Sequence, residues 1–497
     1  MANVAFIRSE LKALLDQYYL IRDCLLGETI IKKRRTTYLP IPGSDKTSED
    51  ALARYRDYLL RAVFYNVTRR TLGGLVGQVF MREPIIKLPE ILKVIESDVT
   101  GTGISLVQQA KSSLAMTLAY SRSGLFVDYP IVEGSATIAD LQTGKIRPTI
   151  YAYAPYEVIN WRTATEGANQ ILTLVVLAEL YEYADDGFEV MQAQQFRVLK
   201  LNDSGHYVME IWRELAPTMS DGSKIKTGNY SLFETLEPRD YSGAPMREIP
   251  FRFIGSENND VLPDSPNLYD LASLNLAHYR TSADYEEACF MVGQPTPVLT
   301  GLTEEWVAKV LKGVVAFGSR GGIPLPVGGD ARLLEASSNT MQKENMDTKE
   351  RQMVALGAKL VEQKQVQRTA FETKVEATSE GSVLSSTTKN VSDAYLWALG
   401  QCAELTGQLA SSVKFELNTD FDIARMTPEE QKEIVDQWTK GALTFEEMRT
   451  GLRKAGIVTE EDAQAKTKID TAMVDAMALA MPPNVPGDPS AQAKVGP

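Results

Sequence analysis

Histidine and cysteine are scarce in this sequence of 497 residues. The two histidines are His206 and His278, and the three cysteines are Cys24, Cys289 and Cys402. A zinc site needs four nitrogen or sulfur ligands at short spacings such as C-x-x-C, and no cysteine here has another nearby in the chain. Isolated cysteines are typical of reducing compartments, where disulfides are rare. The sequence therefore predicts neither a zinc centre nor a disulfide framework.

Long apolar runs are missing as well. The longest, from Ile171 to Ala178, is far shorter than the stretch of about 20 residues that spans a bilayer. The opening sequence MANVAFIRSELKALL places Arg8 and Glu10 where a secretory signal peptide has an unbroken apolar core. We therefore expect a protein without membrane contacts that is made in the cytoplasm.

Positive charge is in deficit. The chain has 52 lysines and arginines against 65 aspartates and glutamates, a formal net charge of −13. A protein that holds nucleic acid by neutralising its phosphates needs an excess of basic residues. The balance argues against a nucleic-acid binder that relies on the charge of its whole surface. The 44% of hydrophobic residues nevertheless provide ample material for a folded core.

No phosphate-binding loop is complete. The segment GSDKTS, from Gly43 to Ser48, is similar to such a loop. However, Asp45 stands before Lys46, where a working loop needs a glycine so that backbone amides can wrap a phosphate. We expect an ordinary exposed loop.

Asp185, Asp186 and Glu189 leave two interpretations open. Carboxylates can gather around magnesium, but the stretch also has the Asp and Gly residues of a hairpin turn, which we favour. No G-x-S-x-G motif occurs, and a Ser-His-Asp site would have to use His206 in a predicted hairpin or His278 in a predicted helix. We expect His278 to face a neighbouring helix. The sequence therefore predicts no enzyme activity, no metal site and no cofactor.

Helical spacing of apolar residues dominates the first 120 residues or so. Helices are predicted over 3–25, 61–84 and 103–119, with an exposed loop at 39–50. The second of these helices contains Gly73, Gly74 and Gly77, each of which costs about 1 kcal/mol of helix propensity. Such a cost is usually tolerated where another backbone must come close.

Strand patterns take over from Ser123 to about Phe253. Three alternating stretches are separated by ADDG (184–187) and NDSG (202–205), both of which are typical of hairpin turns. This section is therefore expected to form an antiparallel meander.

Two long helices and a small insert follow. Ser265 can cap a helix with Pro266 at its first position, and the apolar pattern continues to about Met291. A Pro/Gly-rich segment of mixed α/β character separates this helix from a second one over 339–363. Because long helices with narrow apolar seams cannot bury themselves alone, they imply packing against neighbours, including copies of the same chain. The pattern indicates a component of an assembly.

The rest of the chain is mostly helical. A polar segment over 363–381 precedes a helix that begins near Ser385, and a strand is predicted at 413–417. The apolar stripe of that helix consists of Val391, Ala394, Ala398, Cys402 and Leu405.

Three helix-start signals mark the C-terminal region. Capping boxes begin at Thr427 and Thr444, and a near variant begins at Thr459, with Gly441 and Gly456 as breaks between the helices. The final residues, PPNVPGDPSAQAKVGP, are too rich in proline, glycine and alanine to pack and are expected to be disordered or to depend on a partner for their order.

The order of these segments resembles a tailed-bacteriophage portal protein, and in particular a portal-like family first known as a domain of unknown function. The resemblance covers roughly residues 51–470. It rests on RAVFYNVTRRTLGGLVGQVFMREP (61–84), YAPYEVINW (153–161), the stretch from IPFRFIG to GQPTPVLTG (249–301), and the stretch from NTDFDIARM to GIVTEED (418–462).

The resemblance implies an α+β portal fold with a β-rich wing, two long stem helices, a small α/β clip, a tunnel loop and helix, and a helical C-terminal crown. Residues 1–265 would form the N-terminal helices and the wing, 266–291 the first stem helix, 292–338 the clip and 339–363 the second stem helix. Residues 364–426 would form the tunnel loop, the tunnel helix and a returning wing strand, 427–480 the crown and 481–497 a disordered tail.

Proteins of this family form a twelve-fold ring at one capsid vertex, through which double-stranded DNA enters and leaves. The resemblance thus implies a structural virion protein that is assembled in the host cytoplasm. Its partners would be copies of itself, the large terminase, head-completion or adaptor proteins, and the major capsid and scaffold proteins. The resemblance places Lys364, Arg368 and Lys374 in the tunnel loop that faces DNA, with solvated loop charges as the alternative.

Two other function classes stay open. Another ring-forming head or tail component, such as an adaptor, would share the tendency to assemble, but adaptors are usually much smaller chains. A carboxylate-metal phosphohydrolase would need a compact group of Asp and Glu residues, which the sequence does not display.

Overall fold

The computed structural model describes residues 3–130, 146–185, 187–214, 228–293, 296–309, 325–334, 340–360, 382–419 and 428–454, together with 421, 458, 462, 464–469 and 471. The chain divides into two compact units, 1–419 and 420–497. Helices and strands both contribute, so the fold class is α+β, as predicted. None of the described helices is long and apolar enough to cross a membrane.

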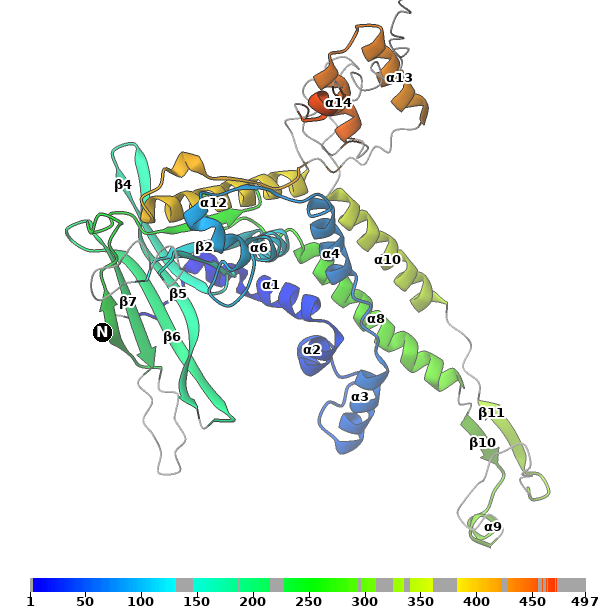
Figure 1. Cartoon of the computed structure of the whole chain (residues 1–497). Helices are drawn as coiled ribbons and strands as arrows, with labels where there is room; N and C mark the ends of the chain where they lie inside the picture. Colours follow the sequence, from blue (N-terminus) through cyan, green and yellow to red (C-terminus); the bar gives the residue numbers. More distant parts are fainter. Residues whose placement is uncertain are drawn as a thin grey trace, which may run out of the picture. The chain divides into compact units, whose positions relative to one another are not determined.

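Short helices make up most of the first 120 residues (Figure 1). They are α1 (Ser9–Leu26), α2 (Glu28–Lys33), α3 (Glu49–Arg61), α4 (Val67–Val79), α5 (Lys93–Ser97) and α6 (Leu106–Tyr120), with short 3-10 turns at Arg35–Thr37 and Glu90–Leu92. Side chains fix the start of two of these helices: Ser48 caps α3, and Ser105 and Gln108 form a capping box on α6. Asp45 stabilises the loop before α3, since its Oδ1 accepts hydrogen bonds from the backbone amides of Thr47 and Ser48.

The prediction of a single helix over 61–84 is wrong. Helix α3 ends at Arg61, the next residues are extended, and α4 begins only at Val67. The Oδ1 of Asn66 accepts from the amide of Arg69 and so caps α4. Beside the break, Phe64 is buried in the core and Val63 is exposed.

The middle of unit 1–419 contains two antiparallel sheets. Strands β2 (Arg122–Asp128), β3 (Thr149–Tyr153) and β9 (Phe251–Gly255) form the smaller, in the order β3-β2-β9. The larger has the order β4-β5-β6-β7-β8, from β4 (Val158–Glu166), β5 (Asn169–Asp185), β6 (Val190–Leu201), β7 (Tyr207–Glu214) and β8 (Tyr230–Leu236). The predicted meander is confirmed, and its turns hold Gly187 and Gly205 at φ of 90° and 73°.

A salt-bridged cluster joins the two sheets. The guanidinium of Arg197, on β6, lies 3.0 Å from Asp128 Oδ2 at the end of β2 and 3.0 Å from Glu179 Oε1 on β5. Tyr153, on β3, donates its hydroxyl to Glu179 at 2.6 Å. Burial raises the pKa of Asp128, and Arg197 only partly offsets the rise.

Helix α8 (Tyr269–Gly293) and helix α10 (Met341–Lys359) are the two long helices that the sequence predicts (Figure 1). Between them lies the insert, with strand β10 (Thr296–Thr300), helix α9 (Glu304–Lys309) and strand β11 (Asp330–Leu334). Strands β10 and β11 pair antiparallel, so the insert is of mixed α/β character, as predicted.

The start predicted for the first long helix is wrong, because α8 begins at Tyr269 and not at a cap formed by Ser265. The amide of Asn267 donates to the Oγ of Ser121, far away in the sequence, at 2.9 Å. Leu268 is fully buried. These contacts hold the segment before Tyr269 in a turn.

Helix α12 (Val383–Leu405) and the short strand β12 (Lys414–Glu416) complete unit 1–419. Ser382 caps α12, slightly before the predicted start. Its predicted apolar stripe is buried throughout, as are Val413, Phe415 and Leu417 around β12. Strand β12 pairs with β1 (Ile85–Lys87), so it returns to the N-terminal part of the chain but not to the five-stranded sheet.

Unit 420–497 is helical where the structure describes it. It contains α13 (Pro428–Thr439), α14 (Phe445–Lys454) and helical residues at 464–469. The capping box at Thr444 is confirmed: its Oγ1 accepts from the amide of Glu447, and its own amide donates to Glu447 Oε2 at 2.8 Å. Thr427, Thr459, Gly456 and the tail 481–497 lie outside the described residues.

Candidate functional site: the two-helix stalk

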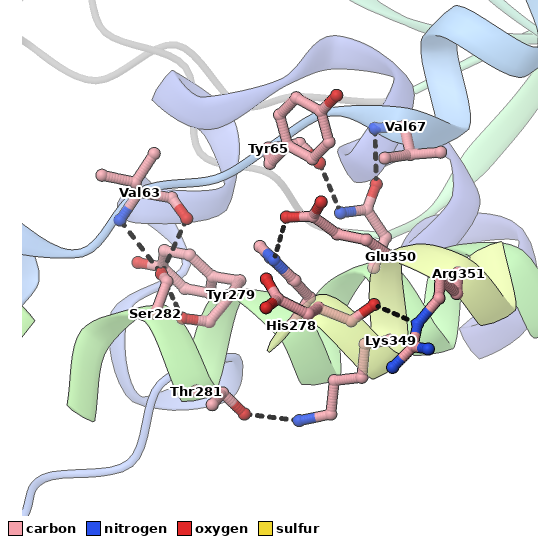
Figure 2. A network of polar contacts seen from close by, with 12 residues as sticks. Val63, Tyr65, Val67, His278, Tyr279, Thr281, Ser282, Lys349, Glu350 and Arg351 are labelled. Carbon is pink, nitrogen blue, oxygen red and sulfur yellow. Dashed lines mark hydrogen bonds and ion pairs between the residues drawn. The ribbon is translucent and has the colours of Figure 1, made fainter. Parts of the chain in front are cut away.

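Helices α8 and α10 pack against each other and form what we call the stalk. Met353 of α10 is fully buried in the contact, as the predicted apolar seam requires. The ammonium group of Lys349 donates to the hydroxyl of Thr281 (Figure 2). It also donates to the carbonyl oxygen of Ala277 at 3.2 Å. Burial lowers the pKa of Lys349, and Asp284 opposes that shift. The stalk is thus held by apolar packing and by a cation that reaches across the helix pair.

His278 faces α10, as expected from the sequence. Its Nε2 lies 3.3 Å from Glu350 Oε1 (Figure 2), and its Nδ1 has no hydrogen-bond partner among the described residues. Burial lowers the pKa of His278, Glu350 acts in the opposite direction, and Lys349 adds to the lowering. The ring is therefore neutral at pH 7. Because a carboxylate only accepts hydrogen bonds, the neutral ring carries its proton on Nε2.

Asn275 ties α8 to the start of α4. Its Oδ1 accepts from the amides of Val67 and Thr68 at 3.1 and 3.2 Å and from the Thr68 hydroxyl at 3.0 Å. Its Nδ2 donates to the carbonyl oxygen of Tyr65 at 2.7 Å. The side chain is fully buried, and it satisfies amides of the first turn of α4 that have no partner within that helix.

Helix α3 holds another side of α8. Tyr58 donates its hydroxyl to Asp284 at 2.6 Å, and burial together with this hydrogen bond raises the pKa of Tyr58. Arg54 and Arg61 both form ion pairs with Glu287. The Arg61 guanidinium also lies over the ring of Phe290, 4.2 Å from its centre. As a result, α8 is anchored by α3, α4 and α10 along most of its length.

Beyond these contacts, apolar side chains at the end of α8 and in the insert are exposed. None of the described side chains of the insert is buried. The exposed apolar residues at this end are Phe290, Met291, Val298, Val307, Val327 and Met341. Val327 is fully exposed, at 109% of its reference area. This part of the chain lacks a core of its own among the described residues.

The residues that the resemblance assigns to a DNA channel, Lys364, Arg368 and Lys374, lie outside the described residues. The structure shows only the two ends of their segment, where the amide of Leu384 donates to the carbonyl oxygen of Leu360 at 3.3 Å. The segment therefore leaves and re-enters the described part of the chain at neighbouring points.

The carboxylates weighed as a magnesium site are only partly described. Asp185 ends β5, Glu189 precedes β6, and Asp186 lies outside the described residues. Among the residues that the structure describes, no three His, Cys, Asp or Glu side chains are arranged to share a metal ion. His206 is half-buried in the turn between β6 and β7.

Asn275 and Lys349 were not singled out from the sequence. Asn275 stands within the apolar pattern of α8, next to Leu274 and Leu276. A buried side-chain amide needs hydrogen-bond partners. The position of Asn275 among apolar residues is therefore the signal that could have indicated a long-range contact. Lys349 gives no comparable signal, because charged residues surround it in α10.

One comparison with known proteins concerns the same region, and two others extend over most of the chain. The family model described as "Domain of unknown function (DUF4055)" matches residues 267–405, which contain the stalk, the insert and α12. No curated protein matches the chain. Among solved structures, the chain is similar to "Neck of native GTA particle computed with C12 symmetry", at 14% identity and a TM-score of 0.40 over 80% of this chain and 93% of that one. It is also similar to "Neck of empty GTA particle computed with C6 symmetry", at 12% identity and a TM-score of 0.39 over 82% and 94%.

Proposed function

We propose that this chain is a portal protein: a structural subunit without enzyme activity that forms a ring at one capsid vertex of a tailed-phage-like particle. Double-stranded DNA would pass through the ring during packaging and ejection. The observation that carries the proposal is the stalk with its insert. Two long helices, firmly anchored on one side, lead to an α/β insert that exposes its apolar residues.

The insert needs partners for physical reasons. A two-stranded sheet is marginally stable in water at best, and β10 and β11 form such a sheet. Exposed apolar residues at the end of α8 and in the insert would lose contact with water if neighbouring copies packed against them. In a closed ring every copy has the same two neighbours, so one interface serves all copies.

The partners follow from the resemblance and stay part of the proposal. The large terminase and the head-completion or adaptor proteins would dock on the insert, and the major capsid and scaffold proteins would surround the ring. The family model matches the section from α8 to α12, which is the section that the resemblance interprets as stem, clip, tunnel loop and tunnel helix. Lys364, Arg368 and Lys374 would then face the DNA.

Electron microscopy of the purified full-length chain tests the proposal. We expect class averages viewed down the particle axis to show closed rings with a channel wide enough for duplex DNA. Changing Val298 and Val327 together to Glu should prevent ring formation, because the charges would have to be buried in the interface. Leu409→Glu is the matched control, since Leu409 is exposed outside the stalk and the insert, and it should leave the rings intact. A monomer under all conditions, with scaffold protein included, would contradict the proposal.

The channel residues need a separate test. Replacing Lys364, Arg368 and Lys374 by Gln should change the conductance of rings inserted in a membrane and the rate of DNA packaging, because three cations per copy would leave the channel. Lys343→Gln, on the exposed side of α10, is the control. If conductance and packaging stay the same in the triple variant, these residues are solvated loop charges only.

A further inference from the structure

A basic pocket lies away from the stalk contacts with α4 and α10. It has a volume of about 510 Å³ and is lined by Glu28, Thr29, Lys32, Lys33, Arg35 and Leu59. All but Leu59 come from α2 and the turn that follows it, and Leu59 belongs to α3. Figure 1 shows α2 and α3. Four consecutive cations, at 32–35, supply the charge in a chain whose net charge is −13. This local charge is opposite to that of the whole chain.

Arg34 fixes the backbone of the pocket from within. Its guanidinium donates to the buried carboxylate of Asp23 at 2.6 Å and 3.2 Å, and the Tyr38 hydroxyl donates to the same carboxylate at 2.8 Å. Burial alone would raise the pKa of Asp23, but the hydrogen bonds from Arg34 and Tyr38 and the nearby guanidinium charges outweigh it and lower that pKa. The ion pair therefore holds the segment on both sides of Arg34 in place.

Two cations of the pocket have no partner of their own in the described residues. Lys32 is satisfied by Glu28, 2.7 Å away, and by the carbonyl oxygen of Leu60. Lys33 and Arg35 are exposed and form neither a hydrogen bond through the side chain nor an ion pair with any described residue. The pocket thus presents two uncompensated positive charges beside the hydroxyl of Thr29 and an apolar wall.

Arg35 also has an unusual backbone. Its φ is 46°, a left-handed conformation that is unfavourable for a residue with a side chain. This conformation starts the 3-10 turn Arg35–Thr37. A glycine would adopt it without strain, so the guanidinium at this position comes together with a strained backbone. Strain of this kind is found at functional sites more often than elsewhere.

We propose that this pocket binds a phosphate group, carried by the backbone of duplex DNA or by a free polyphosphate. Two free cations match two successive phosphodiesters of DNA, each with one negative charge, or a free polyphosphate, which carries several negative charges on neighbouring phosphates. The planar fork of Arg35 and the ammonium of Lys33 are the side chains that proteins use most for phosphate oxygens. The proposal does not depend on the proposed function, since it concerns α2 and α3 and not the stalk.

The test uses the full-length chain and two probes, a short fluorescent duplex DNA and inorganic tripolyphosphate. Binding is measured by fluorescence anisotropy for the duplex and by calorimetry for tripolyphosphate. The variant Lys33→Gln/Arg35→Gln should weaken binding of at least one probe by about tenfold or more at low salt, and lower the slope of log K against log salt for DNA by roughly 2. The matched control Arg162→Gln/Arg247→Gln removes the same charge from exposed positions elsewhere on unit 1–419, and should change binding less than twofold.

Each outcome of these binding measurements either supports the phosphate assignment or rejects it. Loss of duplex binding in the pocket variant assigns the phosphate to DNA, and loss of tripolyphosphate binding alone assigns it to a free polyphosphate. If both double variants weaken binding equally, or if neither probe binds the wild type, the proposal is wrong. Retention of a poly-glutamate peptide by the wild type, with no binding of either phosphate probe, would assign the pocket to an acidic peptide instead.

Arg35→Gly separates binding from folding. It removes the guanidinium and relieves the left-handed backbone, so it should raise the melting temperature by a few degrees while it weakens phosphate binding. A variant that loses both stability and binding would show that Arg35 has a structural role, and this result would overturn the assignment.

Discussion

At the scale of single residues, the stalk depends on a few buried polar side chains with partners far away in the sequence. His278 and Glu350 belong to different helices, and Asn275 contacts residues at the start of α4. Because the low dielectric of the interior strengthens satisfied hydrogen bonds and penalises unpaired groups, such contacts fix how elements meet. Two substitutions test this view.

His278 should make the stability of the chain depend on pH. Its pKa is lower in the folded chain than the ordinary value of about 6.5, so below pH 6.5 the unfolded chain binds more protons than the folded one. The contribution of the neutral ring is therefore complete above pH 6.5 and is lost as the pH falls towards the folded pKa. His278→Gln should lose less melting temperature between pH 7.5 and pH 5.5 than the wild type does. The control is Asn345→Gln, at an exposed position of α10 without a titratable group: it should keep the wild-type pH dependence, and an equal effect of both variants would contradict the assignment.

Asn275→Ala should be one of the more destabilising changes in unit 1–419. It removes four hydrogen bonds from a fully buried side chain and leaves the amide of Thr68 without a partner, while the amide of Val67 keeps the carbonyl oxygen of Tyr65. We expect a loss of about 2 to 4 kcal/mol in the free energy of unfolding, measured by urea denaturation. Asn345→Ala, at an exposed position of α10, should cost less than about 0.5 kcal/mol. Similar losses for both variants would show that Asn275 does not anchor α4.

At the scale of elements, α4 departs from what its sequence suggests. The glycines Gly73, Gly74 and Gly77 were expected where another backbone comes close. In the described residues, however, no atom outside the helix lies within 4 Å of the position that a Cβ would occupy at any of them. Their helix-propensity cost therefore has no compensating contact within the described chain.

Alanine at these glycines should stabilise the chain. Gly73→Ala and Gly77→Ala should each raise the free energy of unfolding by about 0.5 to 1 kcal/mol, because alanine loses less backbone entropy and nothing is displaced. Gly124→Ala is the opposite case, because the Cβ of the new alanine would clash with the Phe251 ring. This variant should lower the free energy of unfolding. Thermal melts of the three variants separate the two situations. A loss of stability at Gly73 would mean that its surroundings are more crowded than the described residues indicate.

Much of the element order could be predicted from the sequence, because periodicity and local caps are encoded nearby. The meander, the capping box at Thr444 and the buried stripe of α12 are of this kind. The errors arose where a residue that is distant in the sequence determines the point at which a helix begins. Ser121 holds the segment before α8, and Asn275 of α8 binds the start of α4. For the same reason the helical partner of His278 could be expected, but Glu350 as the specific residue could not.

At the scale of the whole molecule, charge and apolar surface act in opposite directions. Each copy carries a net charge of −13, so a twelve-membered ring of the proposed kind would carry on the order of −150, and its subunits repel one another. The exposed apolar residues of the insert favour association by the hydrophobic effect, which added salt does not weaken. The balance between the two terms should therefore shift with ionic strength.

Ring formation should increase as salt is added. The Debye length falls from about 10 Å at 0.1 M to about 3 Å at 1 M, which screens the repulsion between subunits. Sedimentation velocity at several salt concentrations measures the fraction of rings. The double variant Val298→Glu/Val327→Glu is the control, and it should stay unassembled at every concentration because its interface lacks the apolar contacts. If rings of the wild type dissociate as salt increases, ion pairs between copies dominate the interface, and the apolar insert does not drive assembly.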